Sequence, residues 1–181
     1  MENIEGVSAL GEAMRRSASL AELSLSNCGI GPTGLTTLAK FITDSAAIRL
    51  LDVSKNRFGD ESIQVLSTAV KSTGIENLNL ADTGMTLASL TFLAADISEM
   101  AALNAITVSS TGSKYDRRRK GSGPITYTLE GLQGGADPNL DLSSKNLGPA
   151  DLEFVSVVFT SFSKFSAAVK FLDVSKNSIG F

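Results

Sequence analysis

The sequence predicts an α/β solenoid of about six repeats, with parallel strands lining a concave face and helices covering the convex face. Two observations predict it. The hexapeptide LDVSKN stands at 51–56 and again at 172–177. It belongs to a longer pattern, in which an eleven-residue segment with apolar positions 1, 4, 6 and 11 recurs along the chain. A fixed period of this kind is typical of repeat proteins, whose neighbouring units bury one continuous core.

Six segments carry this pattern, with exceptions at Ser113 (position 11) and Asp137 (position 1), and their residues are numbered 1 to 11 throughout. They are 20–30, 48–58, 75–85, 103–113, 137–147 and 169–179. The first four start 28, 27 and 28 residues apart, and the next two steps are 34 and 32 residues. Positions 4 and 6 alternate with polar residues, which is the period of a strand with one buried face. We therefore expect six short strands, stacked in parallel into one continuous sheet.

Position 9 marks the bend at which the chain leaves each strand. It holds Cys28, Asn56, Thr83, Thr111, Lys145 and Asn177. Backbone groups at such a bend lose their partners in the sheet, and a short buried side chain that bonds neighbouring turns satisfies them. We therefore expect Asn56 and Asn177 to turn inward. Cys28 is expected to be buried and inert, because the chain has no histidine that could activate its thiol.

Apolar residues three and four apart predict a helix in most of the stretches between the strands. The predicted buried faces are Leu35, Leu38 and Ile42; Ile63, Leu66 and Val70; Leu90, Leu93 and Ile97; and Leu152, Val155, Phe159 and Phe162, to which Phe154 and Phe165 add. Val7, Leu10 and Met14 have the same spacing, so residues 1–19 are expected to form an initial helix without a strand of its own.

The pattern breaks at residues 112–136. A polar, basic stretch is followed by alternating Ile125, Tyr127 and Leu129, which predict a strand, and then by turn residues. We expect a projecting loop and an extra strand, forming a hairpin, to replace one helix. The expected organisation is a single domain over 1–181, with regular repeats at 20–111 and the final repeats at 137–181.

The complete segments resemble the leucine-rich repeat in its intracellular, ribonuclease-inhibitor-like form of 28 residues. They are LAELSLSNCGI at 20–30, IRLLDVSKNRF at 48–58 and VKFLDVSKNSI at 169–179. Sensor regions of NLR proteins, Ran GTPase-activating protein and regulators of actin capping protein carry the same form. The resemblance covers residues 7–181 except the irregular middle. It implies a right-handed, curved solenoid that binds other proteins.

Composition narrows the function further. The chain has no histidine, one cysteine and a formal net charge of −3. It therefore lacks the commonest general base and metal ligand, and GSGP at 121–124 has no strand-to-helix context for binding phosphate. We predict no enzymatic activity, no cofactor and no metal site. No apolar run of membrane-spanning length and no secretory signal is visible, which favours the cytoplasm or the nucleus.

The concave sheet face is the first candidate binding surface. Its predicted partner-binding residues are Glu22, Ser24, Arg49, Asp52, Lys55, Glu76, Asn77, Asn79, Asp82, Asp141 and Asp173. Position 7 is small in every segment and is expected to point the same way, so a partner could approach the backbone closely. Small polar residues also suit an open sheet face that water alone covers. Both interpretations stay open at this point.

The second candidate is a basic loop. Its residues are Lys114, Tyr115, Arg117, Arg118, Arg119 and Lys120. Such a cluster could bind an acidic protein surface, phosphoinositide head groups, RNA or a nuclear import receptor, and it equally suits a solvated loop. A single basic run on an acidic protein does not indicate nucleic acid, so we expect no specific nucleic-acid partner.

We predict a scaffold or adaptor that binds another protein. Two alternatives remain: regulation of a small GTPase, by resemblance to the Ran GTPase-activating branch, and recruitment to acidic partners or anionic membranes through 114–120. The open ends of the solenoid also predict self-association, because unpaired strand edges invite pairing. The sequence leaves open whether the chain is a slice of a larger solenoid or a short protein whose ends are covered.

Overall fold

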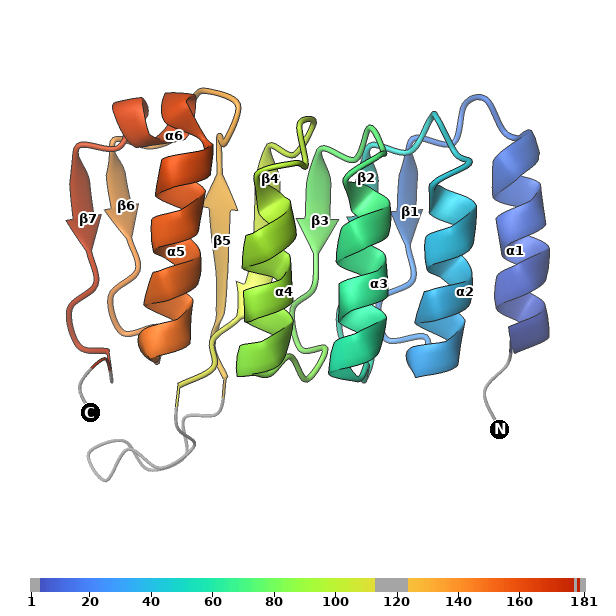
Figure 1. The fold of residues 1–181 in the computed structure, drawn as a ribbon, viewed down its shortest axis with the longest axis horizontal. Helices are drawn as coiled ribbons and strands as arrows, with labels where there is room; N and C mark the ends of the chain where they lie inside the picture. Colours follow the sequence, from blue (N-terminus) through green and yellow to red (C-terminus); the bar gives the residue numbers. More distant parts are fainter. Residues whose placement is uncertain (1–3, 113–123, 178, 180–181) are drawn as a thin grey trace.

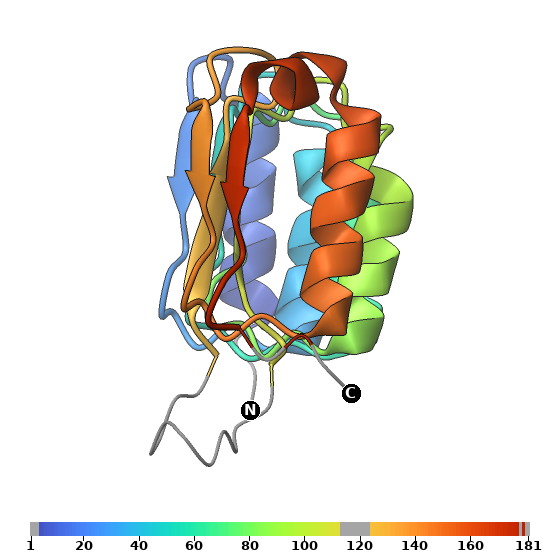
Figure 2. The same cartoon turned by 90° about the vertical axis from the view of Figure 1, so that its left-hand side faces the viewer.

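A computed structural model describes residues 4–112, 124–177 and 179 of the chain. The strands lie side by side in one layer, and the helices pack in a second layer on one side of them (Figure 1 and Figure 2). The helices are α1 (Ile4–Arg16), α2 (Pro32–Ile42), α3 (Asp60–Val70), α4 (Leu87–Ile97), α5 (Pro149–Ser161) and α6 (Ser163–Ala168). The strands are β1 (Glu22–Ser24), β2 (Leu50–Asp52), β3 (Asn77–Asn79), β4 (Ala105–Ser109), β5 (Thr126–Glu130), β6 (Asn139–Asp141) and β7 (Phe171–Asp173).

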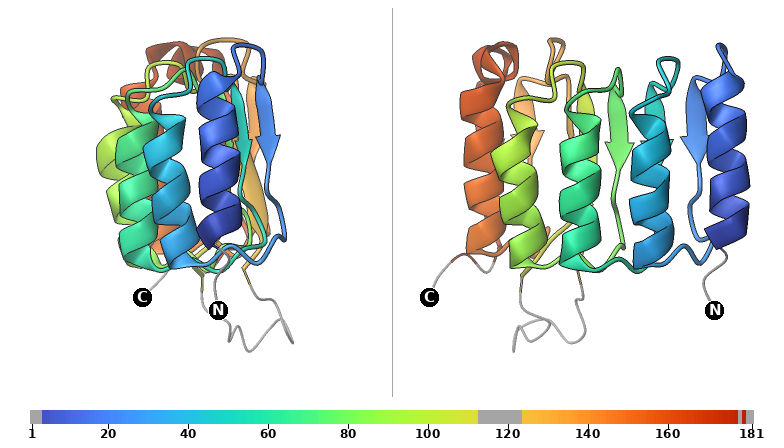
Figure 3. Two further views of the ribbon diagram at one scale, coloured as in Figure 1. Left: turned by 90° about the vertical axis from the view of Figure 1, so that its right-hand side faces the viewer. Right: turned by 45° about the vertical axis from the view of Figure 1, so that its right-hand side comes forward.

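The first four strands pair in parallel and in the register that the repeat pattern predicts. Position 4 of each segment lies opposite position 4 of the next, so that Leu51 faces Leu23 on one side and Leu78 on the other. Strand β4 continues this register against β3. The helices α1 to α5 follow one another along the stack in chain order (Figure 3). This regular packing of strand and helix units is the architecture of a solenoid.

The expectation of one continuous sheet is wrong. Strand β5 runs antiparallel to β4, with Val108 opposite Tyr127, and it occupies the edge at which the next parallel strand would pair. In the described residues β6 and β7 form a separate, two-stranded parallel sheet, in which Leu140 lies opposite Leu172. Helix α5 nevertheless packs directly against α4, so the helical layer continues across the break in the strands.

The predicted helix faces form the core. The three apolar residues that the sequence assigns to each of α2, α3 and α4 are all at most 1% exposed. On the strand side, Leu51 and Val53 are fully buried. For α5 the prediction is confirmed in part. Phe154, Val155, Phe162 and Phe165 are buried as predicted and Val158 is buried as well, whereas Leu152 and Phe159 are only partly buried.

Each regular strand ends in the same bend. Position 8 adopts a left-handed backbone conformation in five segments, with φ between 55° and 58° at Asn27, Lys55, Asp82, Ser144 and Lys176. This conformation is unfavourable for most residues with a side chain. It turns position 9 toward the core. The Asn56 side chain, 2% exposed, donates to the carbonyls of Leu25, Val53 and Ser54 and accepts from the Ile30 N–H.

Asn177 repeats this role in the last segment, where it donates to the carbonyls of Leu142 and Val174 and accepts from the Leu147 N–H. The inward turn predicted for both asparagines is therefore confirmed. The fifth segment differs, because Asn146 at position 10 is buried and Lys145 at position 9 is only half-buried.

Cys28 corrects another expectation, because it is exposed. Its thiol makes one weak contact, 3.6 Å from the carbonyl oxygen of Ser26. In later segments position 9 is covered by the preceding strand and its bend, as the bonds from Asn56 to Leu25 illustrate. In the described part of the chain no strand precedes β1, so nothing covers Cys28.

Candidate functional site

The strand face is the surface of the two sheets that points away from the helices. All the residues that the sequence assigns to it are exposed or half-buried. Glu22, Ser24, Arg49, Lys55, Glu76, Asp82 and Asp141 are exposed, and Asp52, Asn77, Asn79 and Asp173 are half-buried. The break in the strands separates the last two aspartates from the rest. Asp141 and Asp173 belong to the β6–β7 sheet, and the others lie on or beside β1, β2 and β3.

The aspartate and asparagine side chains at position 5 lie on the strand face and also accept hydrogen bonds from the backbone at the ends of their strands. The Asp52 carboxylate accepts a hydrogen bond of 2.9 Å from the Ser54 N–H, and Asn79 binds the Ala81 N–H in the same way. Asp141 and Asp173 repeat this local turn. The side-chain and backbone hydrogen bonds from Ser143 hold the pKa of Asp141 below its ordinary value. These side chains stabilise the strand ends, whatever else they bind.

Position 7 does not line the surface as expected. Ser54, Ala81 and Ser109 are 4%, 7% and 7% exposed. Their side chains pack against neighbouring repeats: the hydroxyls of Ser26 and Ser54 lie 2.9 Å apart, and the Ser109 hydroxyl accepts from the Asp82 N–H. The small column therefore fits adjacent strands together in the middle of the stack, and it does not open the backbone to a partner there.

A shallow hollow of about 240 Å³ crosses the strand face from β2 to β5. Leu50 and Ala105 provide apolar surface, and Asn77, Thr107, Thr128 and Glu130 provide polar groups around it. Thr128 and Glu130 come from β5 and were absent from the sequence-predicted set. The alternation of residues 125–129 predicted that strand, but only the antiparallel pairing places it beside β4 on this face.

The charges around the hollow are only partly compensated. Arg49 and Glu76 form an ion pair of 3.6 Å, and Arg49 also donates to the carbonyls of Ala46 and Ile48. Within residues 4–112 and 124–177, neither Asp52 nor Glu130 has a cationic partner within ion-pair distance. Among the described residues, the hollow therefore presents two carboxylates without a cationic partner beside an apolar floor.

A buried carboxylate that the sequence did not single out joins the larger sheet to helix α5. Asp151 is 0% exposed, in the first turn of α5. One of its oxygens accepts from the N–H and hydroxyl of Thr111 and from the Gly148 N–H, at 2.7–2.9 Å. The other oxygen accepts from the Tyr127 hydroxyl at 3.1 Å. Burial, with the charge and hydrogen bond of Asp151, raises the pKa of Tyr127 and keeps its hydroxyl a donor.

A family model supports the architecture. The model for the leucine-rich repeat matches residues 16–39 and 46–67, which contain β1 with most of α2 and β2 with most of α3. Both matches lie in the regular stack, where the same strand register and the same buried helix face recur from one repeat to the next. The chain is a leucine-rich repeat protein. Leucine-rich repeat domains generally mediate protein–protein interactions.

The second sequence-predicted surface of this leucine-rich repeat protein, the basic loop, lies outside the described residues. That applies to Lys114, Tyr115, Arg117, Arg118, Arg119 and Lys120. The two described residues nearest to it, Gly112 and Pro124, both line a cavity of about 640 Å³ beside the first turns of α4 and α5. The backbone is tight here, because a Cβ on Gly112 would lie 1.9 Å from the Asn146 carbonyl oxygen.

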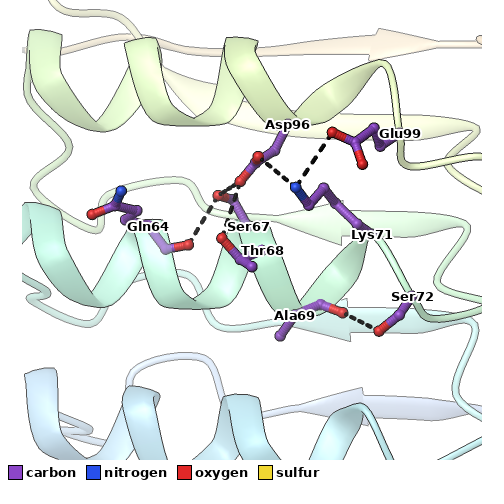
Figure 4. A network of polar contacts seen from close by, with 8 residues as sticks. All are labelled: Gln64, Ser67, Thr68, Ala69, Lys71, Ser72, Asp96 and Glu99. Carbon is purple, nitrogen blue, oxygen red and sulfur yellow. Dashed lines mark hydrogen bonds and ion pairs between the residues drawn. The ribbon is translucent and has the colours of Figure 1, made fainter.

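The helix face of the leucine-rich repeat stack carries a polar network between α3 and α4 (Figure 4). Asp96 accepts from the Ser67 hydroxyl at 2.5 Å, from Thr68 at 3.3 Å and from the Lys71 ammonium at 3.0 Å. Partial burial alone would raise the pKa of Asp96, but these hydrogen bonds and the Lys71 charge outweigh it and lower the pKa. The hydrogen bond to Asp96 in turn raises the pKa of Lys71. The network ties two neighbouring helices together.

Two features are absent from the described residues. No three histidine, cysteine, aspartate or glutamate side chains come together there as a metal site would require. No helix among these residues has the length and apolar character needed to cross a membrane.

Proposed function

We propose that this leucine-rich repeat protein is a scaffold or adaptor that binds a protein partner through the strand face of β1–β5. The observation that carries the proposal is the hollow between β2 and β5. It combines an apolar floor at Leu50 and Ala105 with carboxylates, at Asp52 and Glu130, that have no cationic partner in the described residues. Such a surface can remain exposed to water. A partner that carries a basic side chain beside an apolar one would pair with the carboxylates and cover the apolar floor, so both features favour its binding.

The binding set that we propose keeps the sequence-predicted residues around β1–β3 and adds two from β5, Thr128 and Glu130. Asp52 and Asn79 also hold the strand ends, so their replacement would mix a binding effect with a folding effect. Asn77 and Glu130 line the hollow and lie on different strands, so they are the better probes. Asp141 and Asp173 belong to the smaller sheet and stand outside this proposed set.

The test is comparative affinity capture. The wild-type chain, N77R, E130R and the helix-face control Q64R are immobilised at equal density, and captured proteins are identified by mass spectrometry. Gln64 is exposed on α3, on the opposite side of the molecule from the hollow. We expect at least one protein that wild type and Q64R capture and that N77R and E130R lose. If the proteins captured by wild type are also captured by both N77R and E130R, the proposal is contradicted.

We further propose that the chain contains six repeats and that 112–136, including β5, stands in place of one helix. The scaffold or adaptor role that we propose for the protein requires no catalysis and no cofactor, and we propose that the protein is located in the cytoplasm or nucleus. No feature of the described residues favours regulation of a GTPase over other protein partners. Recruitment through residues 114–120 stays a prediction, which co-sedimentation with anionic vesicles at low and high salt would test.

A further inference from the structure

The two outer strands of the stack have open edges. In the described residues β1 pairs only with β2, and β7 pairs only with β6. Leu172 on β7 is 41% exposed, although Leu51 and Leu78 at the same position are 0% and 2% exposed. Beyond β1, Val7, Leu10 and Leu25 line an apolar cavity of about 220 Å³. Core positions are therefore open at both ends.

The backbone groups of the two edges are complementary. At the β1–β2 junction the N–H groups of positions 6 and 8 donate to the next strand: Leu25 to the Asp52 carbonyl and Asn27 to the Ser54 carbonyl. The β6–β7 junction repeats this, from Leu142 to Asp173 and from Ser144 to Ser175. By the same pattern the outer edge of β7 presents the N–H groups of Val174 and Lys176. The outer edge of β1 presents the carbonyls of Ser24 and Ser26.

A second set of bonds runs in the opposite direction. The carbonyl of position 2, Ala21 or Pro138, accepts from the N–H groups of positions 2 and 3 on the following strand. By this pattern the Lys170 carbonyl lies on the outer edge of β7, and the N–H groups of Ala21 and Glu22 lie on the outer edge of β1. The two edges fit each other in the register that the protein already uses internally.

We propose that β7 of one copy binds β1 of a second copy, with Leu172 opposite Leu23, as a head-to-tail continuation of the sheet. Helix α1 of the second copy then covers Leu172. The charges agree with this pairing. Residues 4–24 carry Glu5, Glu12 and Glu22 against Arg15 and Arg16, whereas residues 163–177 carry three lysines against one aspartate. Opposite net charges favour approach of the two ends.

Cys28 reports directly on this junction. It stands at position 9 of the first segment, and the same position is 2% exposed at Asn56 and 1% at Thr83, where a preceding strand covers it. Cys28 is exposed, and among the described residues no strand pairs with the outer side of β1. A docked β7 would cover it. The chain has a single cysteine, so the rate of thiol labelling measures this one position.

The test uses two variants that each block one edge. V174P removes an outward N–H of β7, and E22P removes an outward N–H of β1; a proline at either edge breaks no internal strand pairing. For wild type we expect the molar mass in sedimentation velocity to rise with concentration, while Cys28 labelling slows in parallel. Each variant alone should remain a monomer with reactive Cys28.

The equimolar mixture is the decisive measurement. One intact β7 edge, from E22P, and one intact β1 edge, from V174P, remain, so the mixture should form a dimer and no larger species. Only Cys28 of V174P should then be protected. A wild-type chain that stays monomeric, or an E22P chain that still associates with itself through a symmetric contact, would overturn the proposal.

A folding control is included. If a proline variant loses its thermal unfolding transition, F171E takes its place, because it sets a carboxylate opposite Glu22 across the junction. Phe171 is 59% exposed and contributes little to the core. F171E should remain monomeric alone, and the double variant F171E/E22K, which sets opposite charges across the junction, should associate again. Failure of that rescue, with the double variant folded, would equally count against the proposed register.

Discussion

The regular stack from β1 to β4 and the junction from β4 to β6 are held together in different ways. In the regular stack the same stabilising contacts recur. Leucines at position 4 of neighbouring strands lie opposite one another, and the side chain of Asn56 at position 9 donates a hydrogen bond to the bend of the preceding repeat. At the junction the parallel ladder ends, and one buried carboxylate, Asp151, bonds the end of β4, the β5 strand and the first turn of α5.

This difference has an energetic consequence. The stability of a repeat protein is close to a sum of repeat and interface contributions, so no single tie in a regular stack dominates. At the junction four hydrogen bonds converge on Asp151, so the loss of this one group breaks all four at once. We therefore expect the largest single-residue effects at the junction, intermediate effects inside the stack and small effects on the helix surface.

The largest expected effect is that of D151A. It leaves four donors without their acceptor, from Thr111, Tyr127 and Gly148, in a site with no exposure. Buried donors without partners cost about 1–3 kcal/mol each, and partial rearrangement should keep the total loss of unfolding free energy at about 3–5 kcal/mol. Urea denaturation measures it. E153A, on the exposed side of the same helix, is the control, and equal stability of the two variants would refute a special role for Asp151.

Next in size is the contrast between L51A and L172A. The two leucines occupy the same place in identical hexapeptides, but Leu51 is fully buried and Leu172 is 41% exposed. L51A should lower the unfolding free energy by about 2–5 kcal/mol, because it leaves a cavity in a packed core. L172A should cost about 1 kcal/mol or less in dilute monomeric protein. Equal losses would mean that the stack is not open at β7.

The asparagines give a smaller contrast of the same kind. N56A removes four hydrogen bonds at a site that is 2% exposed, and should cost about 1–3 kcal/mol. Asn177 makes three equivalent bonds but is half-buried, so water can replace part of what N177A removes. Thermal unfolding of the two variants side by side should rank N56A as the less stable. The reverse order would contradict the structural role of this position.

The sequence predicted the parts of this fold that are repeated, because each repeat reports the same local environment. The strands, the buried helix faces and the inward turn of Asn56 are of this kind. The repeat pattern does not distinguish the first repeat of the stack from the inner ones. Cys28 was therefore predicted to be buried, whereas the structure shows it exposed. The strand face was predicted correctly in outline, but its packing was not. Ser54 has the sequence signature of a small surface residue and is buried by its neighbours.

Asp151 was missed for a different reason. An acidic residue in the first turn of a helix has an ordinary local explanation, since it stabilises the helix N-terminus. Its partners Thr111 and Tyr127 are 40 and 24 residues away along the chain. The antiparallel direction of β5 brings them together, and the alternation of residues 125–129 predicts a strand without predicting its direction.

The smallest expected effect concerns Asp96 in the α3–α4 network, and it depends on pH. Its pKa lies below the ordinary value in the folded chain, so it stabilises the fold above its unfolded pKa, and this contribution disappears as pH falls through the folded pKa. D96N should therefore cost about 1 kcal/mol at pH 7 and progressively less below about pH 4. Chemical denaturation from pH 7 to pH 2.5 should show the free energies of unfolding of D96N and wild type converging.

E99Q is the control, because Glu99 binds the same Lys71 at 3.4 Å from a side chain that is 65% exposed, and an exposed pair of this kind contributes little. A difference between D96N and wild type that persists undiminished at the lowest pH would show that the hydroxyl contacts, and not the charge of Asp96, hold the two helices together.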